Sequence, residues 1–262
     1  MEIVTNVPAV VLLIGSFLVM IALRMPIVFA IGLSSIATTF YLDLPLQMVA
    51  QNKVDGIIAL TYNPDLKIPP DVRSVSIDRY LSGSTTCVAS DNYNGGRLAA
   101  QKLVENGCKN LAFLRIGSPL TSETNKRRDG FVAECEAMQL PCTQKILMDD
   151  APLSEFEHFL EENLKDGRLA FDGIFCVTDK LAVAVIKMLR RMGQRVPEDV
   201  QVIGYDGLRA FGDQDYYCST IIQPVEAMAE TCVDLVLQDS HANTPSLLCL
   251  PVRYAYGGTT KA

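Results

Sequence analysis

From about Asn52 onward, short apolar runs rich in β-branched residues alternate with segments whose apolar residues follow helical spacing. This alternation is typical of βα units, in which each helix returns the chain to the same edge of a parallel sheet. Several runs are continuously apolar, as strands covered by helices on both faces should be. The predicted strands are 54–60, 74–77, 86–89, 111–116, 145–148, 173–177 and 200–205. The pattern therefore predicts an α/β fold built on parallel sheets.

The helices predicted between these strands carry apolar stripes that repeat every three to four residues. One stripe covers residues 131–138 and a longer one covers residues 181–192. Gly193 stands where the longer helix should end, and Pro197 prevents it from resuming. Such stripes face a core, so we do not interpret them as cofactor-binding motifs.

The amino-terminal region is far more apolar than the rest of the chain. Residues 7–23 carry no charged side chain, and neither do residues 25–42 beyond Arg24, so each run approaches the ~20 apolar residues of a membrane-spanning helix. A cleaved signal peptide would begin with basic residues, which are absent here before position 24. A helix buried in a soluble core is the other alternative, but the two runs together are too long for one. We expect residues 1–51 to form one or two membrane-type helices that tether the chain to the inner membrane through residues 7–42.

The chain is acidic, with a formal net charge of −7 at pH 7. Its densest basic stretches, 126–128 and 190–191, are short and lie in segments with helical spacing. They are better explained as solvated helix faces than as contacts to phosphates. Because an acidic protein without a basic patch is repelled by a phosphate backbone, we expect no direct specific binding of DNA by this chain.

The eight cysteines are scattered, with no Cys-x-x-Cys pair and no spacing suited to zinc. Most of them fall within apolar runs, as Cys176 does in Gly173–Val177. Buried free thiols of this kind are typical of a reducing compartment rather than of a disulfide framework. We therefore expect no metal site, and we place the region beyond residue 51 in the cytoplasm.

The apolar amino-terminal region resembles a known membrane protein. The stretch from Gly15 to Ser35, followed by Leu44–Gln51, is similar to the amino terminus of the large membrane subunit of TRAP-type dicarboxylate transporters. The resemblance covers only the beginning of the chain, and the later helices that would form a transport path have no counterpart here. It therefore implies a transporter fragment and no transport activity.

A second resemblance follows the chain in order over most of its length. The segments that carry it are 54–58, 91–112, 127–131, 196–206, 220–224 and 250–253. The most specific is Val196-Pro-Glu-Asp-Val-Gln-Val-Ile-Gly-Tyr-Asp206. Together they resemble the effector-binding domain of LacI-type transcriptional repressors, which implies a two-lobed type I periplasmic-binding-protein-like fold over residues 52–262. The lobes implied are 52–90 with 224–250, and 91–223 with 251–262.

The resemblance leaves out parts that precede the effector domain of a LacI-type repressor. The helix-turn-helix headpiece and the opening strands of the first lobe have no recognisable counterpart, and residues 1–51 stand in their place. The predicted strand 54–60 would then have an unpaired apolar edge. We expect an incomplete first lobe that is marginally stable, aggregates or is completed by another chain.

Folds of this class bind ligands at the carboxyl ends of their strands, where loops bring polar groups together. Asp78 and Asp206 each follow or end a predicted strand, so both carboxylates can accept hydrogen bonds from sugar hydroxyls. The resemblance implies ligand roles for both, and also for Arg127, whose guanidinium suits the recognition of hydroxyls or carboxylates. The remaining candidates are Thr178 and Gln223, at matching positions, and Tyr62 on the first loop.

These candidates have structural alternatives. Asp206 could cap a helix, as could Asp91, because Asp frequently does so at a strand-to-helix turn. Arg127 could be a solvated helix residue. Asp78 could pair with its neighbour Arg79.

One departure from the family bears on the ligand. LacI-type proteins often present an aromatic ring to the ligand after the strand that here ends at Met148, where this chain has Asp149 and Asp150. We therefore do not expect stacking on a sugar ring, and a more polar or cationic effector gains weight.

Catalytic motifs are missing from the sequence. The two histidines, His158 and His241, lie away from every motif described above. A Gly-x-Ser-x-Gly elbow, a Walker loop and a His-Glu-x-x-His pattern are also absent. We expect no catalytic residues and no cofactor, so that the protein is not an enzyme; an enzyme of unrecognised type is the alternative.

Three functional hypotheses follow. The first is a cytoplasmic sensor domain of a LacI-family regulator, without its own DNA-binding headpiece, that binds a sugar or sugar derivative and has a second copy of the chain as a candidate partner. The second is a membrane-anchored solute-binding protein for uptake, which the eight unpaired cysteines oppose. The third is a non-functional chimera of regulator and transporter fragments. We favour the first.

Overall fold

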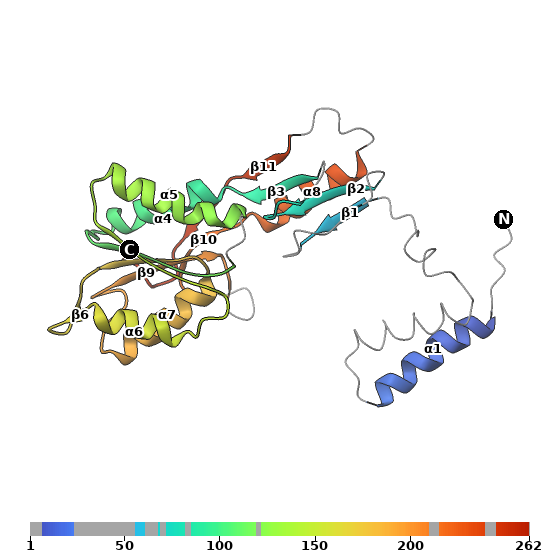
Figure 1. Ribbon diagram of the computed structural model, residues 1–262, viewed down its shortest axis with the longest axis horizontal. Helices are drawn as coiled ribbons and strands as arrows, with labels where there is room; N and C mark the ends of the chain where they lie inside the picture. Colours follow the sequence, from blue (N-terminus) through green and yellow to red (C-terminus); the bar gives the residue numbers. More distant parts are fainter. Residues whose placement is uncertain are drawn as a thin grey trace. The chain divides into compact units, whose positions relative to one another are not determined.

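The computed structural model describes residues 7–23, 56–60, 68, 72–81, 85–118, 122–209, 215–238 and 245–261. The chain forms two compact units, Met1–Val54 and Asp55–Ala262, and each is described by itself (Figure 1). The limits expected for the domains and lobes stay predictions.

In the first unit, the apolar run 7–23 forms helix α1 over Val7–Ala22. At 1.5 Å per residue its 16 residues extend about 24 Å, less than the ~30 Å hydrocarbon core of a bilayer. None of the helices in the described parts of the chain is long and apolar enough to cross a membrane. The prediction of a membrane-type helix is therefore not supported at residues 7–23, and the run 25–42 lies outside the described residues.

The second unit contains a parallel four-stranded sheet in the order β1, β2, β3 and β11. Its strands are β1 (Gly56–Ala59), β2 (Arg73–Ile77), β3 (Thr86–Ser90) and β11 (Leu247–Leu250). Helix α8 (Val225–Leu237) packs against this sheet, where Met228 and Cys232 meet Val75 and Val88 in a small core. Among the described strands β1 forms an edge of this sheet, and Ile58 on it is 44% exposed.

The same unit contains a six-stranded sheet in the order β12, β10, β9, β8, β4 and β5. Its strands are β4 (Leu111–Ile116), β5 (Cys142–Leu147), β8 (Gly173–Cys176), β9 (Gln201–Asp206), β10 (Ser219–Ile222) and β12 (Arg253–Ala255). Neighbouring strands are parallel except β12, which runs antiparallel to β10. A separate short hairpin joins β6 (Leu164–Lys165) to β7 (Arg168–Leu169).

Four helices cover the two faces of the six-stranded sheet. They are α4 (Asn92–Glu105), α5 (Lys126–Ala137, which follows the short 3₁₀ helix η1, Glu123–Asn125), α6 (Ser154–Glu162) and α7 (Asp179–Arg191). Helices α4 and α5 lie on one face, and α6 and α7 on the other (Figure 1). Gly96 and Gly130 let α4 and α5 cross closely, because a Cβ at either position would collide with a backbone carbonyl of the facing helix.

Four aromatic rings form the centre of the larger core. Phe113, Phe131, Phe175 and Tyr205 are all buried, and the neighbouring ring centroids lie 5.2 to 6.4 Å apart. These spacings and tilted planes are those that aromatic pairs prefer. The cluster fixes strands β4, β8 and β9 against α5, so the polar groups at the ends of these strands have a rigid base.

All seven predicted strands are present, as β1 to β5, β8 and β9, and their bounds differ from the prediction by a few residues. The largest difference is in β5, which begins at Cys142 rather than Lys145. Its first residues include the exposed Thr143 and Gln144, so no apolar run marks them. The α/β fold with parallel sheets and flanking helices is confirmed.

Candidate ligand-binding site

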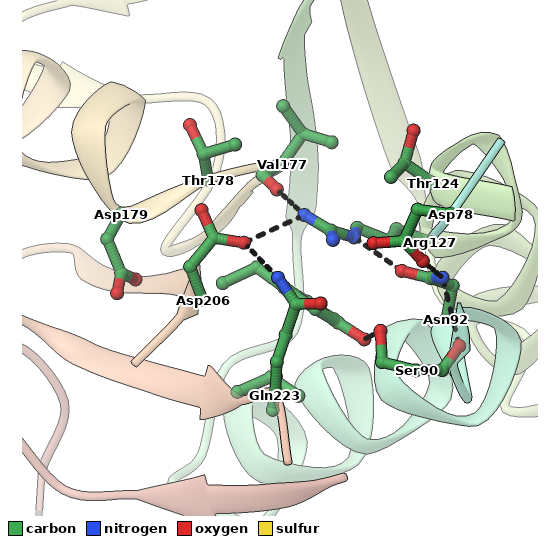
Figure 2. A network of polar contacts seen from close by, with 12 residues as sticks. Asp78, Ser90, Asn92, Thr124, Arg127, Val177, Thr178, Asp179, Asp206 and Gln223 are labelled. Atoms are coloured by element: carbon green, nitrogen blue, oxygen red, sulfur yellow. Dashed lines mark hydrogen bonds and ion pairs between the residues drawn. The ribbon is translucent and has the colours of Figure 1, made fainter. Parts of the chain in front are cut away.

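Polar side chains gather where strands of both sheets reach their carboxyl ends (Figure 2). Asp78 follows β2, Asp206 is the last residue of β9, and Gln223 follows β10. Val177 follows β8, and Arg127 lies in the first turn of α5. The structure brings four of the predicted candidates together at this edge, Asp78, Arg127, Asp206 and Gln223, and their roles in ligand binding stay predictions.

Arg127 is the centre of this network and is only 2% exposed. Its Nε donates a hydrogen bond to Oδ1 of Asn92 at 2.7 Å. Its Nη1 donates to the carbonyl of Val177 at 2.8 Å and to Oδ1 of Asp206 at 3.3 Å. The guanidinium carbon lies 3.6 Å from the centroid of the Tyr205 ring, a cation–π contact. The alternative that Arg127 is a solvated helix residue is therefore wrong.

Asp206 receives two donors on one oxygen. Nη1 of Arg127 and Nε2 of Gln223 both donate to its Oδ1, the latter at 2.7 Å. Burial raises the pKa of Asp206, and the charge of Arg127 opposes this effect. Residues 207–209 after Asp206 form a loop, so they do not support the alternative that Asp206 caps a helix.

Asp78 belongs to the network through its side chain rather than through its neighbour Arg79. Its Oδ1 accepts a hydrogen bond from Nδ2 of Asn92 at 3.3 Å, whereas Arg79 donates to the backbone carbonyl of Asp78. Burial raises the pKa of Asp78, and the charge of Arg127 again opposes the shift. The hydrogen bonds therefore pair the Asp78 carboxylate with Asn92 and not with Arg79.

Both candidate carboxylates have an unusual backbone conformation. Asp78 has a φ of 54° and Asp206 a φ of 118°, in the region that residues with side chains rarely adopt. Strained backbone of this kind persists where the surrounding structure holds it, and it is frequent at ligand sites. Gln139 and Asp166, which lie away from the network, also have positive φ, so this conformation agrees with a ligand role for Asp78 and Asp206 but does not assign one.

Asn92 connects the groups that come from the two sheets, and the sequence prediction missed it. The residue is buried, accepts from Arg127 and donates to Asp78 and to the carbonyl of Ser90, the last at 2.9 Å. Through Asn92, the network joins Asp78 to Arg127 and Asp206 (Figure 2). Asn92 is the first residue of α4, two positions after the end of β3, in the segment 91–112 that carries the LacI resemblance.

Two polar residues near the network cap helices. Oδ1 of Asp91 accepts from the backbone N–H of Asn94 at 3.1 Å, so the capping alternative is confirmed for Asp91. Oγ1 of Thr178 accepts from the backbone N–H of Leu181 at 3.3 Å and caps α7. The structure therefore gives Thr178 a capping role, and its ligand role stays a prediction. Tyr62 lies outside the described residues.

Asp179 supports the loop that follows Asp206 and was not predicted either. It is buried, and its Oδ2 accepts from the backbone N–H of Leu208 at 2.7 Å. Burial raises the pKa of Asp179 to about 6. A Cβ on Gly204 would collide with the carboxylate of Asp179, so glycine is required there. Asp179 thus fixes the backbone of the loop that follows Asp206.

Comparisons with known proteins identify the family. The model of the periplasmic binding protein-like domain matches residues 100–260. A sucrose operon repressor from Pediococcus pentosaceus is 34% identical over 223 residues, which are 82% of this chain and 67% of the repressor. The chain belongs to the LacI-type periplasmic-binding-protein-like family. It spans about two thirds of the length of the curated LacI-type relatives it matches.

Solved structures of LacI-type proteins share the fold. A periplasmic binding protein/LacI transcriptional regulator from Alkaliphilus metalliredigens, in complex with D-xylulofuranose, is 26% identical with a TM-score of 0.62, covering 83% of this chain and 82% of that one. A LacI family regulator from Enterococcus faecalis with bound ribose is 22% identical with a TM-score of 0.60, covering 82% and 80%. Neither these structures nor the repressor supports the resemblance of residues 15–51 to a TRAP-type subunit.

Proposed function

We propose that this chain is the effector-binding part of a LacI-type transcriptional regulator and that its effector is a sugar or sugar derivative. The observation that carries the proposal is the network around the buried Arg127, which bonds Asp206 directly and is linked to Asp78, from the other sheet, through Asn92. The related proteins from A. metalliredigens and E. faecalis bind D-xylulofuranose and ribose, which supports this ligand class.

The chemistry of the network suits a polyol. A sugar hydroxyl both donates and accepts hydrogen bonds, so it is matched by a carboxylate beside a guanidinium. At Asp206, both donors from the described residues fall on Oδ1, which leaves Oδ2 to accept from a ligand hydroxyl. At Arg127, the hydrogen bonds to described residues use Nε and Nη1, which leaves Nη2 to donate. We assign Thr178, Gln223 and Tyr62 as further candidate contacts.

The cellular setting is part of the proposal. We place the domain in the cytoplasm as a homodimer without direct specific binding to DNA through this chain, in keeping with its net charge of −7. The described residues provide no observation that favours the alternative of a membrane-anchored protein for solute uptake. Sedimentation of the purified chain tests the dimer.

Thermal unfolding of the full chain with D-ribose, D-xylulose, sucrose, amino acids and nucleobases tests the ligand class. A sugar at 100 times its dissociation constant should stabilise the fold by ~2.7 kcal/mol. Asp206→Ala should abolish this shift, whereas Asp129→Asn, at an exposed carboxylate on the same helix as Arg127, should preserve it. A shift with amino acids or nucleobases but with none of the sugars would contradict the proposal, and so would a sugar response that survives Asp206→Ala.

A further inference from the structure

Helix α8 exposes a row of apolar side chains in addition to the face that it buries. The buried face packs on the four-stranded sheet through Met228, Cys232, Leu235 and Val236. The exposed residues are spaced by four and are Val225, Ala229, Val233 and Leu237. Val233 is 46% exposed and Leu237 is 63% exposed. Because residues four apart are neighbours on a helix surface, these side chains form one continuous apolar row.

The apolar row lies on the side of α8 that adjoins the edge strand β1. A Cβ on Gly56 of β1 would collide with the side chain of Val236, so this part of the helix lies directly against the strand. Val233 precedes Val236 by three residues and Ala229 precedes it by seven, which places both near Val236 on the helix surface. The middle of the apolar row therefore runs beside β1.

Ile58 of β1 adds a further apolar side chain next to this row. It lies two residues from Gly56, so both face the α8 side of the sheet. Ile58 pairs with Val75, which is fully buried in the core under α8, yet Ile58 itself is 44% exposed. Among the described helices, only α8 contributes to that core. Ile58, Ala229 and Val233 thus line an exposed apolar surface, which we call the α8–β1 seam.

Carboxylates border the apolar row of α8. Glu226, Glu230 and Asp234 are exposed, lie four residues apart, and each follow a member of the row by one position. In the parts of the chain that the structure describes, none of these three carboxylates takes part in an ion pair. Like charges at this spacing destabilise a helix, so positive groups placed beside them would stabilise it. The charge of α8 therefore favours a basic partner.

We propose that the α8–β1 seam binds a helix of another protein whose apolar row is flanked by lysines or arginines. Helices pack about 8–10 Å apart and strands lie about 4.8 Å apart, so a helix beside α8 would extend over β1 and cover Ile58. Its apolar row would contact Ala229 and Val233, and its basic flank would face the carboxylates of Glu226 and Glu230. A second copy of this chain fits less well, because its own α8 would bring another row of carboxylates to the seam.

The first test measures the binding of a designed peptide to the full chain by fluorescence anisotropy. The probe is a labelled amphipathic helical peptide with a row of leucines flanked by lysines, and its control peptide has glutamates in place of the lysines. The lysine peptide should bind about tenfold more tightly than the glutamate peptide. Its affinity should fall as salt is added, because salt screens exposed charges. Equal affinities of the two peptides overturn the proposal.

The second test locates the peptide on the molecule with variants. Val233→Ser removes an apolar contact without adding charge, and it should weaken the binding of the lysine peptide about fivefold. Glu230→Lys should also weaken binding, whereas the matched Glu161→Lys, at an exposed carboxylate on α6, should leave it unchanged. Val233→Ser and Glu230→Lys proteins that both bind as before overturn the proposal. So does a Val233→Ser change that instead dissociates a dimer of this chain in sedimentation, because a second copy would then occupy the seam.

Chemical cross-linking of the unaltered chain gives a third test that needs no variant to fold. A carbodiimide joins a carboxylate to a lysine amine that contacts it, and mass spectrometry of the digested product identifies the two residues. The lysine peptide should be coupled to Glu226, Glu230 or Asp234 of α8. Coupling to carboxylates of other helices, with none on α8, overturns the proposal.

Discussion

The two sheets of the second unit are stabilised to different extents. The six-stranded sheet has helices on both faces and a core of four packed aromatic rings. The four-stranded sheet packs on α8 through a smaller cluster around Val75 and Val88, and its edge strand exposes Ile58. Because buried apolar area is the main source of stability, the six-stranded sheet should be the more stable of the two.

The candidate site joins these unequal parts. Arg127, Asp206 and Gln223 extend from the six-stranded sheet and its helices, whereas Asp78 extends from the four-stranded sheet. A ligand held by both carboxylates would add contacts between the sheets where Asn92 already links them. The bound ligand would thus stabilise the arrangement in which the less stable sheet is held against the other. A ligand that favours one arrangement of the two sheets shifts the population toward it, so an effector could change the conformation in this way.

The largest expected effect contrasts the two cores. Phe175→Ala removes a ring that contacts three other aromatic rings and should lower the free energy of unfolding by about 3–5 kcal/mol. Val88→Ala in the smaller core should cost about 2 kcal/mol, because less apolar surface is lost. Urea unfolding followed by circular dichroism measures both. A greater loss for Val88→Ala would reverse the ranking of the two sheets.

The fold was predictable because it depends on periodicity. Strand β4 was predicted with its observed bounds, since its first four residues are apolar and buried. Strand β5 was predicted three residues short at its start, because an edge strand exposes polar residues and loses the apolar pattern. Strands β10 and β12 were not predicted as strands, although the segments 220–224 and 250–253 had been matched to the family.

The site was predictable only in part, because burial cannot be read from residue type. Asp78 and Asp206 were found from their place at strand ends, and the family resemblance added Arg127. On composition alone, an arginine in a helix is usually exposed, and only the packing of α5 against α4 shows otherwise. Asn92 and Asp179 were missed because a polar residue at the start of a helix is most simply explained as part of its cap.

The second prediction concerns pH and the six-stranded sheet. The pKa of Asp179 is raised to about 6 from an ordinary 3.8, so the folded protein binds this proton more tightly than the unfolded chain does. The contribution of Asp179 to stability should therefore be complete below its ordinary pKa of 3.8 and be lost, by about 3 kcal/mol in total, as the pH rises through about 6. The raised pKa values of Asp78 and Asp206 act in the same direction. Urea midpoints at several pH values measure the slope.

Two variants identify the group responsible. Asp179→Asn keeps an acceptor for the Leu208 N–H but cannot ionise, so the slope between pH 4 and pH 6 should become flatter. Asp199→Asn is the control, because the Arg195 side chain lowers the pKa of Asp199 to about 2. The contribution of Asp199 is present above its ordinary pKa and is lost only as the pH falls toward 2. An unchanged slope in Asp179→Asn would assign the effect to another carboxylate.

The third prediction tests the link between the sheets. Asn92→Ala removes the acceptor for Nε of Arg127 and the donor to Asp78, so it should cost about 1–3 kcal/mol of stability. It should also weaken the binding of any sugar found in the thermal screen. Asn94→Ala removes an exposed hydrogen bond to Asp91 and should cost less, within about 0.5 kcal/mol. Equal losses of stability in the two variants would show that Asn92 contributes no more than an exposed helix residue does.

The smallest expected effect concerns the edges of the two sheets. Ile58 on β1 is 44% exposed, and Ile146 on β5, the edge strand of the six-stranded sheet, is 41% exposed. Each Ile→Lys change should cost about 1 kcal/mol or less, because neither side chain is fully buried. A lysine on an edge strand discourages pairing with other chains. If the first lobe is incomplete, Ile58→Lys should therefore reduce light scattering at high protein concentration.

Ile146→Lys on β5 is the matched variant, and it tests whether self-association depends on the β1 edge in particular. Both edge strands pair along their whole length with one neighbour, β1 with β2 and β5 with β4. The smaller core contains no residue of β1, whereas Cys142 and Leu147 of β5 pack against the larger core. Self-association should therefore fall with Ile58→Lys and stay unchanged with Ile146→Lys. Equal reductions would mean that any exposed isoleucine on an edge drives association. No reduction with Ile58→Lys would mean that β1 has no free edge in solution, and the contrast between the two sheets would then rest on their cores alone.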